Sequence, residues 1–164
     1  METDTHHQYK AKLDSPWGPL TLLGTEDFVE RLAFPHEELA ADDVPLRPVG
    51  ALAQALLELE QFFSGQRQRF DVATIVDRQL EDVSFQLRAL RCLQQIPYGH
   101  TITYGHLALK AGNPRAARAA GTACATNPVP ILVPCHRVIR SDGTLGHYLG
   151  GSKAKRDLLE LESC

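Results

Sequence analysis

The sequence lacks the features of membrane-spanning, secreted and zinc-binding proteins. It has no apolar run of the roughly 18 residues that a membrane helix requires, and its first ten residues are polar. Its four cysteines lie 32, 11 and 29 residues apart, too widely for zinc-ligand spacing: Cys92, Cys124, Cys135 and Cys164. We therefore expect free thiols, no metal, no membrane partner, and a cytoplasmic location, or a nuclear one if the source is eukaryotic.

Acidic residues are scarce in one half of the chain. Residues 85–164 contain 4 acidic and 10 basic side chains, a net charge of +6, whereas residues 1–84 have a net charge of −9. Between Phe85 and Gly151, Asp142 is the single acid among seven cations. This asymmetry favours a polyanionic partner for the second half, with nucleic acid the first candidate. Cations scattered over a solvated surface are the alternative.

The first half of the chain has the pattern of a small α/β domain. The chain of 164 residues, 43% of them hydrophobic, is long enough to bury an ordinary core. Turn residues and apolar periodicity predict a hairpin with strands at 20–23 and 28–34, followed by a loop at 35–48. They then predict an amphipathic helix at 49–63 and a further strand at 70–76. We assign residues 1–76 to this domain and residues 77–84 to a linker.

The second half, residues 85–164, is expected to form a mainly helical domain. Its apolar spacing and turn residues predict three helices: 85–95, 104–111 and 114–126. Thr103 is a plausible N-cap of the second helix, and Gly112 can end it in the left-handed conformation. Asn113 and Pro114 suit the N-cap and first residue of the third. The last two helices, joined by a tight Gly-Asn turn, have the outline of a helix-turn-helix.

The third expected helix is rich in small residues. Five of them surround Arg118, which lies one turn from Arg115: Ala116, Ala117, Ala119, Ala120 and Gly121. Small side chains let a helix backbone approach its partner closely, and the amino end of a helix favours phosphate. The helix therefore suits a nucleic-acid groove. A close contact with another helix, leaving the arginines exposed, is the alternative.

Among the cysteines, Cys135 has the surroundings of a nucleophile. It lies in Pro134-Cys135-His136-Arg137-Val138, where proline and strand-like residues favour a rigid, extended or sharply turned backbone. The neighbouring His136 and Arg137 should favour the thiolate and lower the pKa of the thiol. For the other three cysteines, a buried apolar role is expected.

These motifs together resemble those of the methylated-DNA–protein-cysteine methyltransferases, also called O6-alkylguanine-DNA alkyltransferases. The resemblance covers about Phe85 to Glu162 and rests on five motifs in the family's order: Ile96-Pro97-Tyr98-Gly99, Thr103-Tyr104-Gly105, 112–119, Asn127-Pro128 with 134–138, and 146–151. Ser15-Pro16-Trp17-Gly18-Pro19-Leu20 resembles, more weakly, the start of the same family's amino-terminal domain.

The resemblance implies a suicidal alkyl transfer to Cys135, without a cofactor. Cys135 would attack the alkyl carbon of O6-alkylguanine, with O4-alkylthymine as a second candidate substrate. His136 would accept the thiol proton through a water, and Glu162 would orient the imidazole. Tyr104 would protonate the departing guanine, and Asn127 would brace the turn that presents the cysteine. The thioether product cannot be reduced back, so each molecule should react once.

The resemblance also implies how double-stranded DNA with alkylated bases is bound by a monomer. The target base must leave the stack, and Arg118 would fill the vacated space. The helix would lie in the minor groove through Arg115, Ala117, Ala119 and Gly121. The expected base pocket consists of five residues: Pro130, Val138, Tyr148, Leu149 and Gly150.

Some residues depart from the family pattern, and other functions are conceivable. Ala89-Leu90 stands where many relatives have Val-Trp, and Leu149 where some have Ser, which removes one hydroxyl contact to the base. An alkyltransferase-like protein would bind the lesion without transfer, but such proteins lack the nucleophile. A helix-turn-helix regulator would need only the arginines, and a cysteine hydrolase would need a second His and an oxyanion hole.

Overall fold

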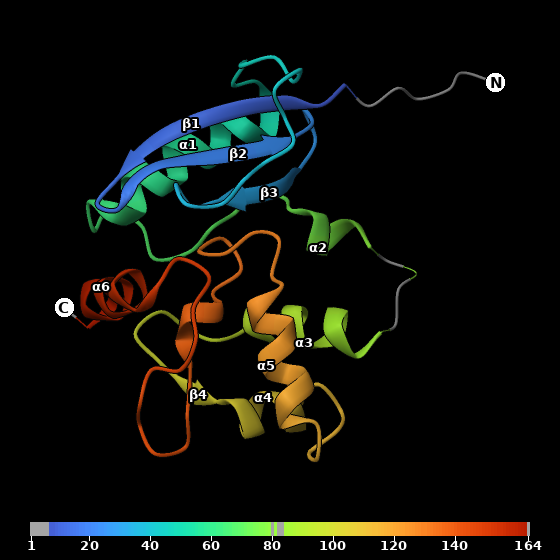
Figure 1. Cartoon of the computed structure of the whole chain (residues 1–164), viewed down its shortest axis with the longest axis vertical. Helices are drawn as coiled ribbons and strands as arrows, with labels where there is room; N and C mark the ends of the chain where they lie inside the picture. Colours follow the sequence, from blue (N-terminus) through green and yellow to red (C-terminus); the bar gives the residue numbers. More distant parts are fainter. Residues whose placement is uncertain (1–6, 80, 82–83, 164) are drawn as a thin grey trace. The chain divides into compact units, whose positions relative to one another are not determined.

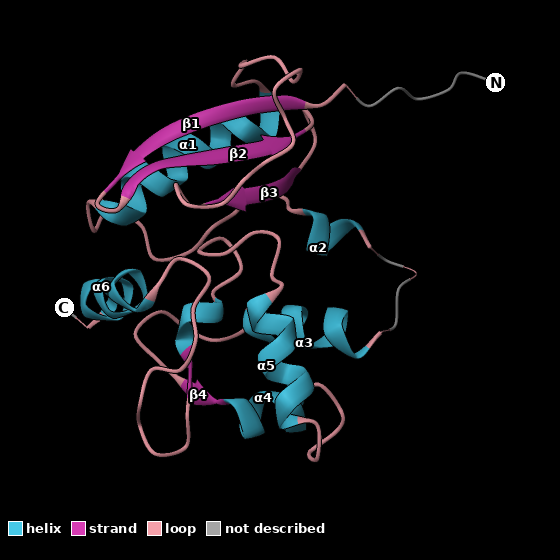
Figure 2. Ribbon diagram, viewed as in Figure 1, coloured by secondary structure: helices cyan, strands magenta, loops and turns pink. Residues whose placement is uncertain are grey.

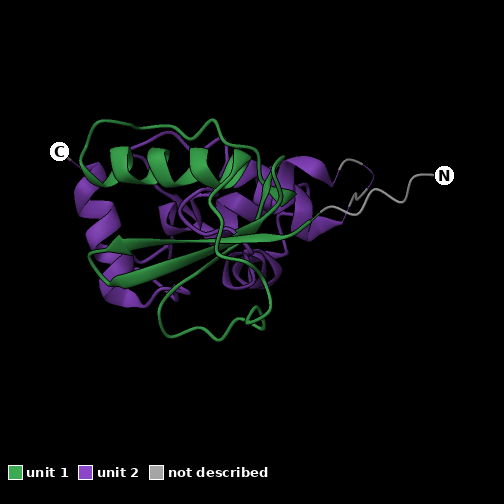
Figure 3. Cartoon of the chain, turned by 90° about the horizontal axis from the view of Figure 1, so that it is seen from above, with its two compact units in different colours: residues 1–75 green, residues 76–164 purple. Residues whose placement is uncertain are grey.

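The structure, a computed structural model, describes residues 7–79, 81 and 84–163. The chain forms two compact units, Met1–Ile75 and Val76–Cys164 (Figure 3). Expectations for the first six residues, for residues 80, 82 and 83 of the linker, and for Cys164 fall outside the described residues. Within the described ranges, no helix is long and apolar enough to cross a membrane, and no three His, Cys, Asp or Glu side chains form a potential metal site.

The first unit is a three-stranded antiparallel sheet with a helix packed across one face (Figure 2). Its strands, in spatial order, and its helix are β1 (Tyr9–Ser15), β2 (Gly18–Gly24), β3 (Val29–Ala33) and α1 (Gly50–Phe63). In the register, Leu13 of β1 faces Leu20 of β2, and both are buried. The expected hairpin is confirmed as β2 and β3, and the expected helix as α1.

Two expectations for this unit need correction. Strand β1 was not expected from the sequence, because only two of its apolar residues, Ala11 and Leu13, are buried, and two positions make a weak alternating pattern. The strand expected at 70–76 is wrong: Thr74 alone makes a bridge, to Val29, and helix α2 (Ile75–Arg78) begins at the next residue. Alternating apolar residues there reflect burial without strand pairing.

The second unit is mainly helical (Figure 1). After α2, the described residues of this unit form four helices, a 3-10 turn and two short strands: α3 (Phe85–Leu93), α4 (Tyr104–Lys110), α5 (Ala117–Ala125), α6 (Ser152–Glu162), η1 (Cys135–Arg137), β4 (Ile102–Thr103) and β5 (Val138–Ile139). Helices α3, α4 and α5 pack against one another, and β4 pairs in parallel with β5. The pairing holds the start of α4 beside the segment that follows η1. The helix α6 was not expected from the sequence.

Both ends of α4 are formed as the sequence predicts. The Thr103 side chain accepts a hydrogen bond from the backbone N–H of His106 at 3.1 Å. At the other end Gly112 has φ of +96°, and the N–H of Asn113 donates to the carbonyl of Ala108 at 3.0 Å. This left-handed ending satisfies carbonyls that the last helical turn leaves open.

The start of α5 differs from the expectation. The helix begins at Ala117, three residues after Pro114. The Asn113 side chain accepts a hydrogen bond from the N–H of Arg115 at 3.1 Å, and so forms a turn before the helix. Arg115 therefore lies in this turn, whereas Arg118 lies in the first helical turn. Asparagine stabilises both arrangements by a local side-chain bond, so the sequence did not distinguish them.

Candidate active site

The segment before Cys135 is a tightly bonded turn. The Asn127 side chain donates to the carbonyl of Val133 at 2.9 Å and accepts from the N–H of Val129 at 3.1 Å. Between them Ile131 is buried with φ of +72°, a strained conformation for a β-branched residue. The N–H of Cys135 then donates to the Val133 carbonyl at 2.8 Å. These contacts fix where the cysteine backbone lies.

The Cys135 side chain is a buried and protonated thiol. Only 2% of the residue is exposed, and burial raises the pKa of the thiol to about 11, despite the lowering effects of Asn127 and Lys155. The lowered pKa expected from the sequence is therefore wrong for the resting protein, because burial outweighs the nearby cations. At pH 7 only about 1 molecule in 10⁴ would carry the thiolate. A reaction of this thiol needs a base.

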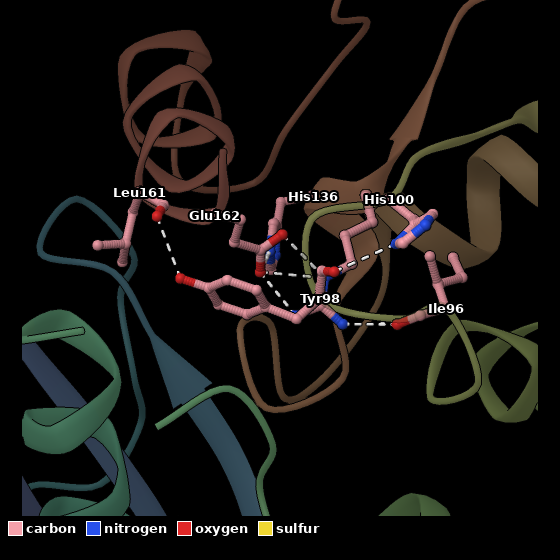
Figure 4. A network of polar contacts seen from close by, with 7 residues as sticks. Ile96, Tyr98, His100, His136, Leu161 and Glu162 are labelled. Carbon is pink, nitrogen blue, oxygen red and sulfur yellow. Dashed lines mark hydrogen bonds and ion pairs between the residues drawn. The ribbon is translucent and has the colours of Figure 1, made fainter. Parts of the chain in front are cut away.

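His136, which follows the cysteine in the sequence, forms a buried pair with Glu162. His136 is 0% exposed, and its Nε2 lies 2.8 Å from Oε1 of Glu162, at the end of α6 (Figure 4). Burial lowers the pKa of His136 in spite of this carboxylate, so the imidazole is neutral near pH 7. Its Nδ1 has no hydrogen-bond partner within the described part of the chain. With Nε2 bonded to Glu162, Nδ1 is the nitrogen of His136 that can accept a proton.

Arg137, which the sequence predicted to favour the thiolate of Cys135, is instead the second partner of Glu162. Its Nε lies 3.0 Å from both carboxylate oxygens, and one terminal nitrogen lies 2.6 Å from Oε1. Burial raises the pKa of Glu162, but the hydrogen bonds from His136 and Arg137 outweigh burial and hold it below its ordinary value. Glu162 is therefore a carboxylate near pH 7.

Tyr104, at the start of α4, is held beside a second buried cation. The Nζ of Lys155 donates to the carbonyl of Val138 at 2.6 Å and lies 3.5 Å from the Tyr104 hydroxyl. Lys155 is 0% exposed, and burial lowers its pKa. Burial also raises the pKa of Tyr104 to about 12, so the phenol keeps its proton near pH 7. A proton donor and a cation thus lie together.

Lys155 could have been found from the sequence by its spacing. Lys155, Leu158 and Glu162 are 3 and 4 residues apart, which puts them on one face of a helix, and all three are buried in α6. A lysine at an inward position of a helix is rarely there for packing alone.

The residues expected to contact DNA and the base lie in two groups. Of the five residues expected to contact DNA, Gly121 in α5 is partly buried. The other four, at and just before the amino end of α5, are exposed: Arg115, Ala117, Arg118 and Ala119. Of the expected pocket residues, Pro130, Val138 and Tyr148 are buried, while Leu149 and Gly150 are partly exposed. The Tyr148 ring meets the imidazole of His136 edge-on, with 6.4 Å between centroids.

A cavity in the second unit borders the site at Glu162. It has a volume of about 280 Å³ and is lined by Gly99, Thr101, Ile139, Gly143, Leu145, Leu159, Glu162 and Ser163. The lining includes neither Cys135 nor any residue expected to hold the base. This cavity is therefore not the expected base pocket.

The site combines a buried cysteine with a buried His-Glu pair, and the comparisons with known proteins identify the family of the chain. Residues 84–164 match the family model described as 6-O-methylguanine DNA methyltransferase, DNA binding domain. A methylated-DNA–protein-cysteine methyltransferase of Mycobacterium tuberculosis is 42% identical over 151 residues, covering 92% of this chain and 89% of that protein. A protein of the same name from Methanosarcina acetivorans is 38% identical over 159 residues, covering 95% and 99%.

A solved structure is similar over nearly the whole chain. The crystal structure of Mycobacterium tuberculosis OGT in complex with DNA has a TM-score of 0.84 and 39% identity, covering 94% of this chain and 92% of that one. The chain belongs to the methylated-DNA–protein-cysteine methyltransferase family. The resemblance found in its motifs is confirmed.

Proposed function

We propose that this protein repairs DNA by moving the alkyl group of O6-alkylguanine irreversibly to Cys135, with O4-alkylthymine as a second substrate. The observation that carries the proposal is the buried thiol of Cys135 next to the His136–Glu162 pair, in a chain that belongs to this family. Relatives of 38–42% identity bear the name of this activity.

The chemistry follows from the protonation states of the site. The sulfur of Cys135 bonds to the alkyl carbon as the bond from that carbon to the guanine oxygen breaks. The thiol proton passes, through a water, to Nδ1 of His136, and Glu162 stabilises the imidazolium. Tyr104 gives a proton to the leaving guanine, and Lys155, 3.5 Å away, stabilises the phenolate until it is reprotonated. The products are a thioether and an intact base.

On the DNA side, we propose that α4 and α5 act as a helix-turn-helix in the minor groove. Arg118 would take the place of the flipped base, and Arg115, Ala117, Ala119 and Gly121 would contact the groove. The exposure of Arg118 and the positive charge of the second half support this role. The base would enter a pocket formed by Pro130, Val138, Tyr148, Leu149 and Gly150. We propose further that a cytoplasmic monomer acts on double-stranded DNA.

The acceptor is tested by mass spectrometry after incubation with duplex that contains O6-methylguanine. We expect a gain of about 14 Da, one methyl group, on the peptide that carries Cys135, and a plateau at one equivalent with excess lesion. Cys135→Ser should abolish the gain and leave DNA binding intact. Cys124→Ser is the matched control, because Cys124 is also a buried thiol, and this variant should still be methylated.

The same experiment distinguishes the alternatives. A protein that binds the lesion but stays unmodified would be an alkyltransferase-like protein. A protein that binds DNA without regard to the lesion would be a helix-turn-helix regulator. Either result would falsify the transferase assignment.

A further inference from the structure

Arg137 is fixed from three sides in the second unit. Its guanidinium spans both oxygens of Glu162, and its other terminal nitrogen donates to the carbonyl of Ile96 at 2.7 Å. The Cζ atom of Arg137 also lies 5.8 Å from the centre of the Tyr98 ring. The Tyr98 hydroxyl in turn donates to the carbonyl of Leu161 at 3.1 Å (Figure 4). The side chain is almost fully buried. These contacts hold the Arg137 guanidinium in one orientation, with the Glu162 carboxylate as its ion-pair partner.

We propose that Arg137 is a positioning residue that neutralises Glu162, and thereby keeps His136 uncharged, with its proton on Nε2 and Nδ1 ready to accept. The inference deepens the proposed function and rests on it, because it names what prepares the base of that reaction.

The charge balance around Glu162 links Arg137 to the protonation of His136. His136 and Arg137 both contact Oε1 of Glu162, at 2.8 and 2.6 Å. With Arg137 present, the carboxylate is already paired, so the three groups are neutral overall only when the imidazole is neutral. Without the guanidinium, the buried carboxylate would need another cation, and the imidazolium of His136 would supply it. A protonated His136 cannot take the proton of Cys135.

The other groups around His136 do not replace Arg137. Lys155, on α6, is the second cation that lowers the pKa of His136, but burial weakens its own charge and its Nζ donates to the Val138 carbonyl. Cys135 is protonated at rest, and Tyr148 presents its ring edge-on to the imidazole. Glu162 is thus the anion, and Arg137 the cation, that decide the charge of His136.

The test is a titration of His136 by NMR of ¹⁵N-labelled histidine, with the resonance assigned from a His136→Gln sample. We expect Arg137→Gln to raise the pKa of His136 by about one pH unit or more. Arg137→Lys, which retains the charge, is the matched control and should leave the pKa close to that of the wild type. The wild type should show a neutral imidazole at pH 7, protonated at Nε2.

Single-turnover methyl transfer then gives the kinetic readout. The rate needs neutral His136, so its fall on the acid side should move to higher pH in Arg137→Gln by the same amount. If the two pKa values of His136 differ by one pH unit, transfer in the variant should be slower by about threefold at a pH midway between them, and by a factor that approaches about tenfold below both values. A residue with only a structural role would lower the rate equally at every pH.

Three results would overturn the proposal: an imidazolium at pH 7 in the wild type, an unchanged or lower pKa in Arg137→Gln, or an equal rise in Arg137→Lys. If Arg137→Gln does not fold, the protonation state of the wild type and the Arg137→Lys titration still decide the question. The titration does not depend on transfer. A failure of the proposed function therefore appears as an unmodified Cys135, and a failure of this inference as an unmoved pKa.

Discussion

At the scale of single residues, the absence of a side chain at Gly146 leaves room for the Tyr104 side chain. A Cβ atom on Gly146 would be 2.8 Å from the Tyr104 hydroxyl, closer than such contacts allow. Gly143, in the same loop, has a similar positive φ, but a Cβ atom there would meet nothing within 4 Å. The two glycines thus share a backbone conformation and differ in what a side chain would displace.

This difference gives a matched pair of variants. Gly146→Ala and Gly143→Ala should each lose roughly 1 kcal/mol of stability, because an L-residue is strained at these angles. Only Gly146→Ala should also slow methyl transfer, on the order of tenfold or more, by moving the proton donor. The measurements are thermal unfolding and single-turnover transfer. Equal transfer rates in the two variants would contradict the role proposed for Tyr104.

At the scale of single elements, the proposed recognition of duplex DNA depends on the amino end of α5. If Arg118 replaces the flipped base, Arg118→Ala should slow repair in duplex on the order of tenfold to a hundredfold, since unstacking costs a few kcal/mol. Repair in a single strand, where the base is already accessible, should change much less. Arg156→Ala, which removes an exposed cation from α6, is the control and should show no such difference. Equal losses on both substrates would identify Arg118 as a simple phosphate contact.

The sequence predicts an element well where its ends depend on neighbouring residues alone, and poorly where one local pattern fits two structures. The ends of α4 follow from Thr103 and Gly112, whose capping roles depend only on adjacent residues. The start of α5 was misplaced because Asn113 stabilises a turn as well as a helix start. The strand at 70–76 was wrong because burial of alternate side chains does not require a pairing partner, and only Thr74 found one.

At the scale of the whole molecule, the sequence indicates Cys135 as the candidate nucleophile but does not predict the environment of its thiol. Cys135 and His136 are adjacent in a specific motif, whereas the contacts of Arg137 reach 41 residues back to Ile96 and 25 residues on to Glu162. The sequence shows a cysteine that is followed by two basic residues, His136 and Arg137. The fold turns Arg137 to Glu162 and buries the thiol, so the pKa of Cys135 is raised where the sequence predicts that it is lowered.

The same buried network predicts how the molecule responds to acid. The pKa of Glu162 is below its ordinary value of 4.5 and that of His136 below 6.5, so the unfolded chain binds protons more readily at both sites. The stability that Glu162 and His136 contribute is fully present at a pH above their ordinary pKa values. It is lost as the pH falls through their lower pKa values in the folded state. Glu162→Gln should therefore be less stable at pH 7 but less sensitive to pH below 4.5.

Urea unfolding followed by circular dichroism at several pH values measures this effect. Glu160→Gln, an exposed change on the same helix, is the control and should keep the acid dependence of the wild type. An acid dependence of Glu162→Gln equal to that of the wild type would show that the carboxylate does not link protons to folding.

The burial of the Cys135 thiol also has a consequence for the lifetime of the unused protein. A molecule that accepts a single alkyl group can be consumed by any electrophile or oxidant that reaches its sulfur first. Such reagents attack the thiolate, and a thiol with a pKa of about 11 and 2% exposure offers them almost none. If Cys135 is the acceptor, we therefore expect the stored protein to keep nearly all of its Cys135 thiols unmodified until it meets alkylated DNA.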